Sequence, residues 1–150
     1  FCRAERDGRI LTVTIDRPKV MNALHPPANR ELAEIDLSEL KKEKQVLMFE
    51  YTDPFGQPAH GFALMWEGEL RAYRNLCPHW SVALDHNGKF FDDEEEELMC
   101  HMHGATFDPG TGRCTWGPPN GAKLETFDLQ EVPGKPGIYK VMRRAGISLI

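Results

Sequence analysis

The sequence predicts an all-β protein built from antiparallel strands, and two observations lead to this prediction. Short runs rich in β-branched and aromatic residues recur along the chain, and clusters of glycine, proline and aspartate separate them. Short strands joined by tight turns are typical of a β-sandwich or β-barrel. With 150 residues, the chain has room for one globular domain and a small appendage.

The first 36 residues predict a strand followed by a helix. Ile10–Ile15 is rich in β-branched residues and ends at an Asp-Arg-Pro turn. Residues 28–34 follow two prolines, and proline is favoured in the first turn of a helix. We therefore expect an N-terminal strand–helix appendage over residues 1–36.

Residues 37–141 predict the main β domain, and residues 142–150 a C-terminal tail. Two of its strands form a hairpin around Glu67-Gly68, and two flank the acidic run at residues 92–97. A strong turn signal, Asp-Pro-Gly-Thr-Gly, covers residues 108–112. The expected strands are residues 46–51, 61–66, 70–74, 89–91, 98–99, 105–107, 124–129 and 138–142.

The composition narrows the function classes. A formal charge of −5 and a pI near 5.7 argue against nucleic-acid binding, which usually requires a basic face. No segment has the length of a membrane-spanning helix, and no apolar stretch of a signal peptide follows the first residues. Two of the four cysteines lie close to a histidine, which suits metal binding better than disulfides. We expect a soluble, cytoplasmic protein.

Two short clusters of metal-binding residues dominate the sequence. The first is Cys77-Pro78-His79, and the second runs from Cys100 through His101 and Met102 to His103. Each cluster places a thiolate and an imidazole on one loop, so two such loops can surround one centre. Thiolate together with imidazole suits zinc or an iron–sulfur cluster and disfavours magnesium or calcium.

At these residues the sequence resembles the Rieske family, from about residue 36 to residue 141. The resemblance rests on both clusters, on residues 104–108, and on a following Gly-Pro loop at residues 117–119. It implies a Rieske-type antiparallel β-sandwich with a cluster-binding subdomain that holds a [2Fe–2S] cluster. By resemblance, Cys77 and Cys100 bind one iron, and His79 and His103 bind the other.

The other histidines are not expected to bind metal. His101 has the wrong offset from Cys100 for the family. His25, His60 and His86 have no neighbours at ligand spacing, so we interpret them as surface or packing residues. The gap between the two clusters is a few residues longer than most soluble members of the family carry. The surplus coincides with residues 92–97, which we interpret as an extended hairpin tip; an acidic docking surface is the alternative.

Residues next to the clusters predict a low reduction potential. The high-potential members of the family carry a disulfide whose positions hold Val82 and Met102 here. They also carry a serine and a tyrosine that donate to sulfur, where this chain has Ala105 and Phe107. Losing these donors lowers the potential toward the bottom of the range of about −150 to +300 mV. Two tryptophans and a cysteine also lie near the clusters: Trp80 and Trp116 could shield the cluster or pack a core edge, and we interpret Cys114 as a small buried residue.

These observations predict a one-electron carrier that passes electrons from a flavin reductase to an oxygenase. No histidine follows His103 and nine residues follow Val141, so we expect no catalytic domain and no enzyme activity. One alternative is an electron-transfer or regulatory subunit of a larger redox enzyme, similar to the small subunit of assimilatory nitrite reductase. Others are a zinc-stabilised structural module, which would be colourless, and a cluster-bearing redox sensor.

The N-terminal segment resembles a different family. Residues 8–24, with Arg17-Pro18 and Asn22-Ala23-Leu24, are similar to the opening of an enoyl-CoA hydratase/isomerase (crotonase). The resemblance ends near Glu34, before that family's oxyanion-hole loops and catalytic acids. We therefore expect no crotonase activity. A strand as short as Ile10–Ile15 cannot bury its own apolar face. We therefore expect it to dock on the main domain or on another chain.

Overall fold

The computed structural model describes residues 2–7, 10–15 and 31–144. The chain divides into two compact units, residues 1–30 and residues 31–150, and each is described by itself. In the first unit, β1 (Cys2–Asp7) pairs antiparallel with β2 (Ile10–Ile15). The strand predicted at Ile10–Ile15 is confirmed, whereas β1 was not anticipated.

The helix predicted at residues 28–34 is wrong where the structure describes it. Residues 31–34 belong to β3 (Glu31–Asp36), and residues 28–30 lie outside the described residues. β3 pairs antiparallel with β11 (Ile138–Arg143), with Ile35 opposite Tyr139. Local helix propensity is a weak prior, and pairing with a distant strand overrides it here. The second unit therefore begins at residue 31. This is six residues before residue 37, where the main domain was expected to start.

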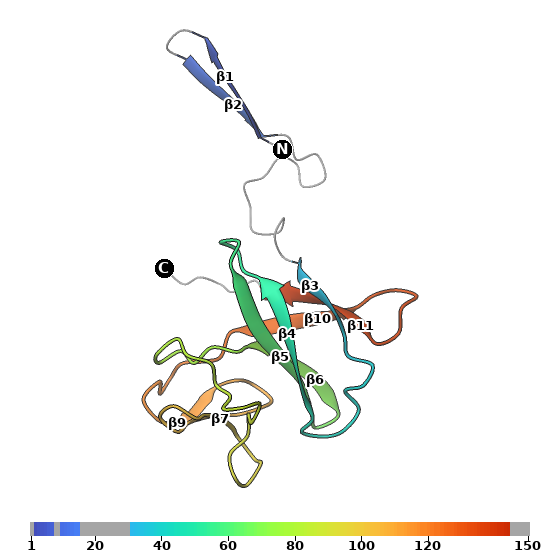
Figure 1. The fold of residues 1–150 in the computed structure, drawn as a ribbon, viewed down its shortest axis with the longest axis vertical. Coiled ribbons are helices and arrows are strands. Elements are labelled where there is room, and N and C mark those ends of the chain that lie inside the picture. The colour runs from blue at the N-terminus through green and yellow to red at the C-terminus, as the bar shows by residue number, and fades with distance from the viewer. Residues whose placement is uncertain (1, 8–9, 16–30, 145–150) are drawn as a thin grey trace. The chain divides into compact units, whose positions relative to one another are not determined.

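The second unit contains a six-stranded and a three-stranded sheet (Figure 1). The large sheet has the order β3-β11-β10-β6-β5-β4, and the small sheet the order β7-β8-β9. Every pairing is antiparallel. The remaining strands are β4 (Val46–Thr52), β5 (Pro58–Trp66), β6 (Glu69–Arg74), β7 (Leu98–Cys100), β8 (Ala105–Phe107), β9 (Cys114–Trp116) and β10 (Thr126–Glu131).

β5 is buried on both faces because it separates two apolar cores. Phe62 and Leu64 point into one core, and the alternate residue Ala63 points into the other. On β6, Tyr73 and Ala72 divide between the same two cores. The first core also holds Leu84, Leu98, Phe107 and both cysteines of the predicted site. The small sheet is therefore anchored on one face of the large sheet.

Two hairpins lie where the sequence predicts them, although the strand expected at residues 89–91 is present only as isolated bridges at Lys89 and Phe91. The β5–β6 turn places Glu67 and Gly68 in the left-handed region, with φ angles of 51° and 75°, as a two-residue turn requires. The acidic run forms an extended hairpin tip, in which Phe91 pairs with Leu98 and the Asp92 amide donates to the Glu97 carbonyl at 3.0 Å. The acidic residues of this hairpin therefore lie beyond the start of β7, before Leu98.

The prediction of an all-β fold with antiparallel sheets is confirmed for the described residues. The structure contains no helix in residues 2–7, 10–15 and 31–144. Among the same residues, it follows that no helix is long and apolar enough to cross a membrane.

Candidate metal centre

The first ligand loop joins β6 to the small sheet and closes on itself. The Cys77 amide donates to the Val82 carbonyl at 2.7 Å, and the Ser81 amide donates back to the Cys77 carbonyl at 2.9 Å. Ser81 adopts a φ of 50°, which turns the chain between these two bonds. The bonds fix the backbone at Cys77, while His79 and Trp80 occupy the exposed apex of the loop.

The second ligand loop is the turn between β7 and β8. Cys100 is the last residue of β7 and pairs with Ala105, the first residue of β8. The Gly104 amide donates to the Cys100 carbonyl at 2.8 Å, and Gly104 has a φ of 73°, a conformation favoured by glycine. The turn buries Cys100 and leaves His103 exposed.

The two loops bring their cysteines together inside the first core. Cys77 and Cys100 are each 1% exposed, and their thiols lie within hydrogen-bonding reach of one another. Burial raises the pKa of the Cys77 thiol, and the neighbouring Cys100 adds to the rise. The backbone amides of His79 and Trp80 donate to the Cys77 sulfur and oppose this rise. These amides are placed to stabilise negative charge on that sulfur.

The two loops also bring their histidines together, at the surface. The ring centroids of His79 and His103 lie 5.2 Å apart, at an interplanar angle of 68°. The Trp80 ring meets His103 edge to face, with centroids 4.7 Å apart. The predicted site is therefore a buried pair of thiols beneath an exposed pair of imidazoles.

This donor set fits the requirements of a two-iron cluster. A mixed Cys/His [2Fe–2S] cluster needs only two protein donors on each iron. One pair of thiols and one pair of imidazoles match this requirement.

Asn75 supports the first loop and was not identified from the sequence. Its side chain is buried, donates to Asp85 Oδ1 at 2.8 Å and accepts from the Leu84 amide at 2.9 Å. These bonds join the beginning of the loop that carries Cys77 to its end. Buried polar side chains in folded proteins are usually hydrogen-bonded, and Asn75 uses its bonds to connect two chain segments. A single asparagine two residues before a cysteine does not reveal this role in the sequence.

A third loop, between β9 and β10, lies against the second. A Cβ placed on Gly117, whose φ is 108°, would be 2.8 Å from Ala105 Cα. On the neighbouring strand, the Cys114 thiol donates to the Trp116 carbonyl at 3.3 Å. The Gly-Pro loop predicted from the sequence therefore reaches the second ligand loop, and this contact requires glycine.

The two positions that set the expected potential are buried beside the cysteines. Ala105 and Phe107 are 1% and 0% exposed and belong to the same core as Cys77 and Cys100. Neither side chain can donate a hydrogen bond. Trp80 and Trp116, in contrast, are 62% and 66% exposed, so they are not packed into the edge of the core.

The remaining histidines lie elsewhere. His101 faces His86, with ring centroids 6.5 Å apart. The buried Nε2 of His101 has no hydrogen-bond partner among the described residues. His60 lies 3.4 Å from Glu50 on the large sheet. His25 lies outside the described residues.

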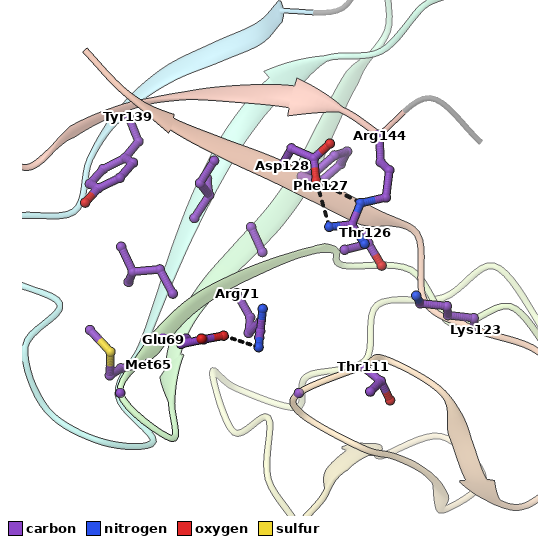
Figure 2. Close-up of a pocket in the computed structure, with 15 residues that line it drawn as sticks. Met65, Glu69, Arg71, Thr111, Lys123, Thr126, Phe127, Asp128, Tyr139 and Arg144 are labelled. Carbon is purple, nitrogen blue, oxygen red and sulfur yellow. Dashed lines mark hydrogen bonds and ion pairs between the residues drawn. The ribbon is translucent and has the colours of Figure 1, made fainter. Parts of the chain in front are cut away.

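A groove with a volume of 770 Å³ opens between the large sheet and the loop at Gly110 and Thr111 (Figure 2). None of the four predicted ligands lines it. Its wall carries two ion pairs, Arg71–Glu69 and Arg144–Asp128. Much of the charge in the groove is thus paired within the protein, and the groove is separate from the four predicted ligands.

Comparison with known proteins connects this arrangement to a described domain. A sequence profile described as "Rieske [2Fe-2S] domain" matches residues 32–133. The oxidoreductase NdmD of Pseudomonas putida is 35% identical over 74 residues, which cover 45% of this chain and 12% of that protein. This chain therefore spans a small fraction of the curated relative that it matches.

Two solved structures share the fold. The ferredoxin of carbazole 1,9a-dioxygenase from Nocardioides aromaticivorans IC177 has 22% identity and a TM-score of 0.53, with coverage of 76% of this chain and 96% of that chain. A chain in the reduced complex between oxygenase and ferredoxin in carbazole 1,9a-dioxygenase has 18% identity and a TM-score of 0.56. The match covers 78% of this chain and 29% of that one. The fold therefore occurs both in a chain of similar length and as part of a much longer chain.

Proposed function

The chain belongs to the Rieske [2Fe–2S] domain family, and we propose that it works as a low-potential, one-electron carrier. The observation that supports this most directly is the pair of thiols beneath the pair of imidazoles, with the Cys77 and Cys100 side chains buried and the His79 and His103 side chains exposed. When bound there, a [2Fe–2S] cluster supplies reversible one-electron chemistry.

We assign Cys77 and Cys100 to one iron and His79 and His103 to the other. The assignment is supported by the 5.2 Å separation of the imidazole rings and the contact between the thiols. Burial of the two thiols keeps water away from the iron that they are assigned to bind. The exposed imidazole edges give a partner protein a short path to the metal-binding residues. We interpret the small sheet with its loops as the cluster-binding subdomain and the large sheet as its base.

The low potential follows from what surrounds the sulfur atoms. Hydrogen-bond donors to cluster sulfur stabilise the more negative, reduced state. The methyl of Ala105 and the ring of Phe107 provide none. A low potential suits an electron carrier that is reduced by a flavin enzyme and oxidised by an oxygenase.

The proposed partners are a flavin reductase upstream and an oxygenase downstream. Support comes from the likeness to a ferredoxin named as part of a dioxygenase and to a complex of ferredoxin with oxygenase. The match to NdmD, whose name describes an oxidoreductase, favours a subunit or domain of a larger redox enzyme as the second candidate. We propose a cytoplasmic location because Cys77 and Cys100 are assigned to iron, which requires that they stay reduced.

Residues 1–30 are proposed to be an appendage without a part in electron transfer. The crotonase-like sequence falls within this unit, and the unit contributes none of the four proposed ligands.

A reductive titration tests the proposed function. We expect the anaerobically purified protein to take up one electron per chain from dithionite and to return it to ferricyanide, with reversible bleaching of its visible absorption. A protein that contains zinc, or one that takes up no electrons after iron–sulfur reconstitution, would contradict the proposal.

A further inference from the structure

The groove shown in Figure 2 has an apolar wall. Leu70, Leu129 and Tyr139 line it and are half-buried, because they pack against one of the two apolar cores. Figure 2 shows Tyr139 at one end of the groove and Lys123 at the other, with Arg71 between them. The volume of 770 Å³ falls in the range of about 300–1,000 Å³ that is usual for sites of small organic molecules.

The carboxylates in and beside the groove already have partners. Arg144 donates to Asp128 Oδ1 through Nε at 2.8 Å and through Nη2 at 2.7 Å. Glu69 is paired with an arginine of its own strand, β6. Asp108, in the loop beside the groove, accepts from both the amide and the hydroxyl of Thr111 at 2.6 Å. A cationic ligand would therefore have to displace a partner that the protein itself supplies.

Two cationic side chains of the groove, in contrast, keep unused donors. Lys123 is exposed, and its ammonium has no ion pair or hydrogen bond within residues 2–7, 10–15 and 31–144. Arg71 is paired with Glu69 through Nη2, but its buried Nε has no hydrogen-bond partner in the described part of the chain. A guanidinium carries five N–H donors, and leaving a buried donor unpaired is unfavourable. The Arg71 side chain is 38% exposed, so an acceptor can reach its outer N–H groups from solvent.

The charge of the groove matches a ligand with a single negative charge. Its lining carries three positive side chains and two negative ones, which leaves a net charge of +1; they are Arg71, Lys123, Arg144, Glu69 and Asp128. A carboxylate carries one negative charge, whereas a phosphate monoester carries about −1.5 to −2 near pH 7. The planar fork of a guanidinium also fits the two oxygens of a carboxylate.

We propose that this groove binds an organic carboxylate with an apolar body. The carboxylate lies between Arg71 and Lys123, and the body covers Leu70, Leu129 and Tyr139. Burial of apolar surface stabilises the complex by about 0.8 kcal/mol for each CH₂ group, so a small anion without an apolar body binds more weakly. The site is distinct from electron transfer, because none of the four proposed ligands lines the groove.

A ligand series tests the proposal on the oxidised, cluster-loaded full chain. Octanoate supplies both the carboxylate and the apolar body, octylammonium reverses the charge, and acetate lacks the body. Binding is followed by two-dimensional ¹H–¹⁵N NMR. We expect octanoate to shift the amide signals of residues 110–112 and 126–129 saturably, with a dissociation constant of about 1 mM or lower. Acetate should bind at least about tenfold more weakly, and octylammonium should give no saturable shift.

The key variant is Lys123→Gln, with Lys135→Gln as the matched control. Lys135 lies between β10 and β11, pairs with Glu34 at 3.4 Å and does not line the groove. Both substitutions remove one positive charge from an exposed side chain, so an effect of net charge would be the same in each. We expect Lys123→Gln to weaken octanoate binding by about fivefold or more, and Lys135→Gln to stay within about twofold of the wild type. Lys123→Arg should retain most of the affinity.

Three outcomes would overturn the proposal. The first is equal octanoate affinity in Lys123→Gln and Lys135→Gln, and the second is octylammonium binding as tightly as octanoate. The third is a set of octanoate-induced shifts that leaves out residues 110–112 and 126–129. Because Lys123 is exposed, its replacement should leave the rest of the amide spectrum unchanged, and that spectrum verifies the fold of each variant.

Discussion

The imidazole rings of His79 and His103 lie 5.2 Å apart, inclined at 68°, although one comes from the loop after β6 and the other from the turn between β7 and β8. Cys77 and Cys100 are buried in the core, and their thiols lie within hydrogen-bonding reach of one another. Each loop supplies one thiol and one imidazole. The packing of the small sheet on the large sheet therefore determines whether the four groups can act together.

The ligand assignment predicts different outcomes for two neighbouring histidines. We expect His103→Ala to lose the visible absorption of the cluster and most of its iron. His101→Gln should keep both, because His101 faces His86 rather than His79. Iron content per chain and the visible spectrum of anaerobically purified protein measure the difference. Loss of iron in both variants, or in His101→Gln alone, would refute the assignment.

The buried environment of Cys77 and Cys100 predicts that added hydroxyl groups raise the potential. We expect Ala105→Ser and Phe107→Tyr each to shift the midpoint potential upward by several tens of millivolts. A hydrogen bond is worth about 1 kcal/mol, and a tenfold change in a one-electron equilibrium is about 59 mV. Potentiometric titration of each variant provides the measurement. An unchanged or lower potential in both would contradict the explanation from hydrogen-bond donors.

Asn75 is predicted to stabilise the first ligand loop. Asn75→Ala removes the acceptor of the Leu84 amide and the donor to Asp85, and leaves the buried amide without a partner. We expect the free energy of unfolding to fall by about 1–3 kcal/mol. Asn120→Ala is the control, because Asn120 is exposed and, among the described residues, only its backbone amide donates, to the Gly117 carbonyl at 3.2 Å. Denaturant unfolding should show only a small decrease in the free energy of unfolding for Asn120→Ala. A similar decrease in both variants would indicate that the Asn75 hydrogen bonds are unimportant.

The close approach of the third loop predicts that Gly117 cannot be replaced. In Gly117→Ala the new methyl would lie 2.8 Å from Ala105 Cα, so backbone would have to move. Gly121→Ala is the matched control, since Gly121 also has a positive φ, 84°, but nothing lies within 4 Å of the added Cβ. We expect Gly117→Ala to be clearly less stable and to lose iron faster to a chelator. Equal behaviour would show that the contact is easily relieved.

Tyr73 predicts a loss of stability at alkaline pH. Burial raises the pKa of its hydroxyl from 10.0 to about 12, and the hydroxyl donates to the Pro109 carbonyl at 2.8 Å. Because the folded state holds this proton more tightly than the unfolded state, the contribution is complete below pH 10 and is lost as the pH rises through about 12. Tyr73→Phe should therefore show a shallower decline in unfolding free energy between these values. Parallel declines in the two proteins would contradict this pKa.

Features defined by neighbouring residues could be predicted from the sequence. The two ligand clusters, the Glu67-Gly68 turn and the acidic hairpin are each encoded within a few residues, and the structure has the turn and the hairpin as expected. Features that depend on distant partners could not be predicted. β3 pairs with β11 across the whole domain, and this pairing replaced the expected helix. The role of Asn75 and the exposure of Trp80 likewise depend on how loops far apart in sequence meet.

The electron paramagnetic resonance spectrum of the dithionite-reduced protein tests the central claim most directly. A [2Fe–2S] cluster with two thiolates on one iron and two imidazoles on the other predicts a signal with an average g value below that of an all-cysteine cluster. The wild type should give this signal, and His103→Ala should abolish it. A reduced protein that gives no signal and contains stoichiometric zinc would contradict the account.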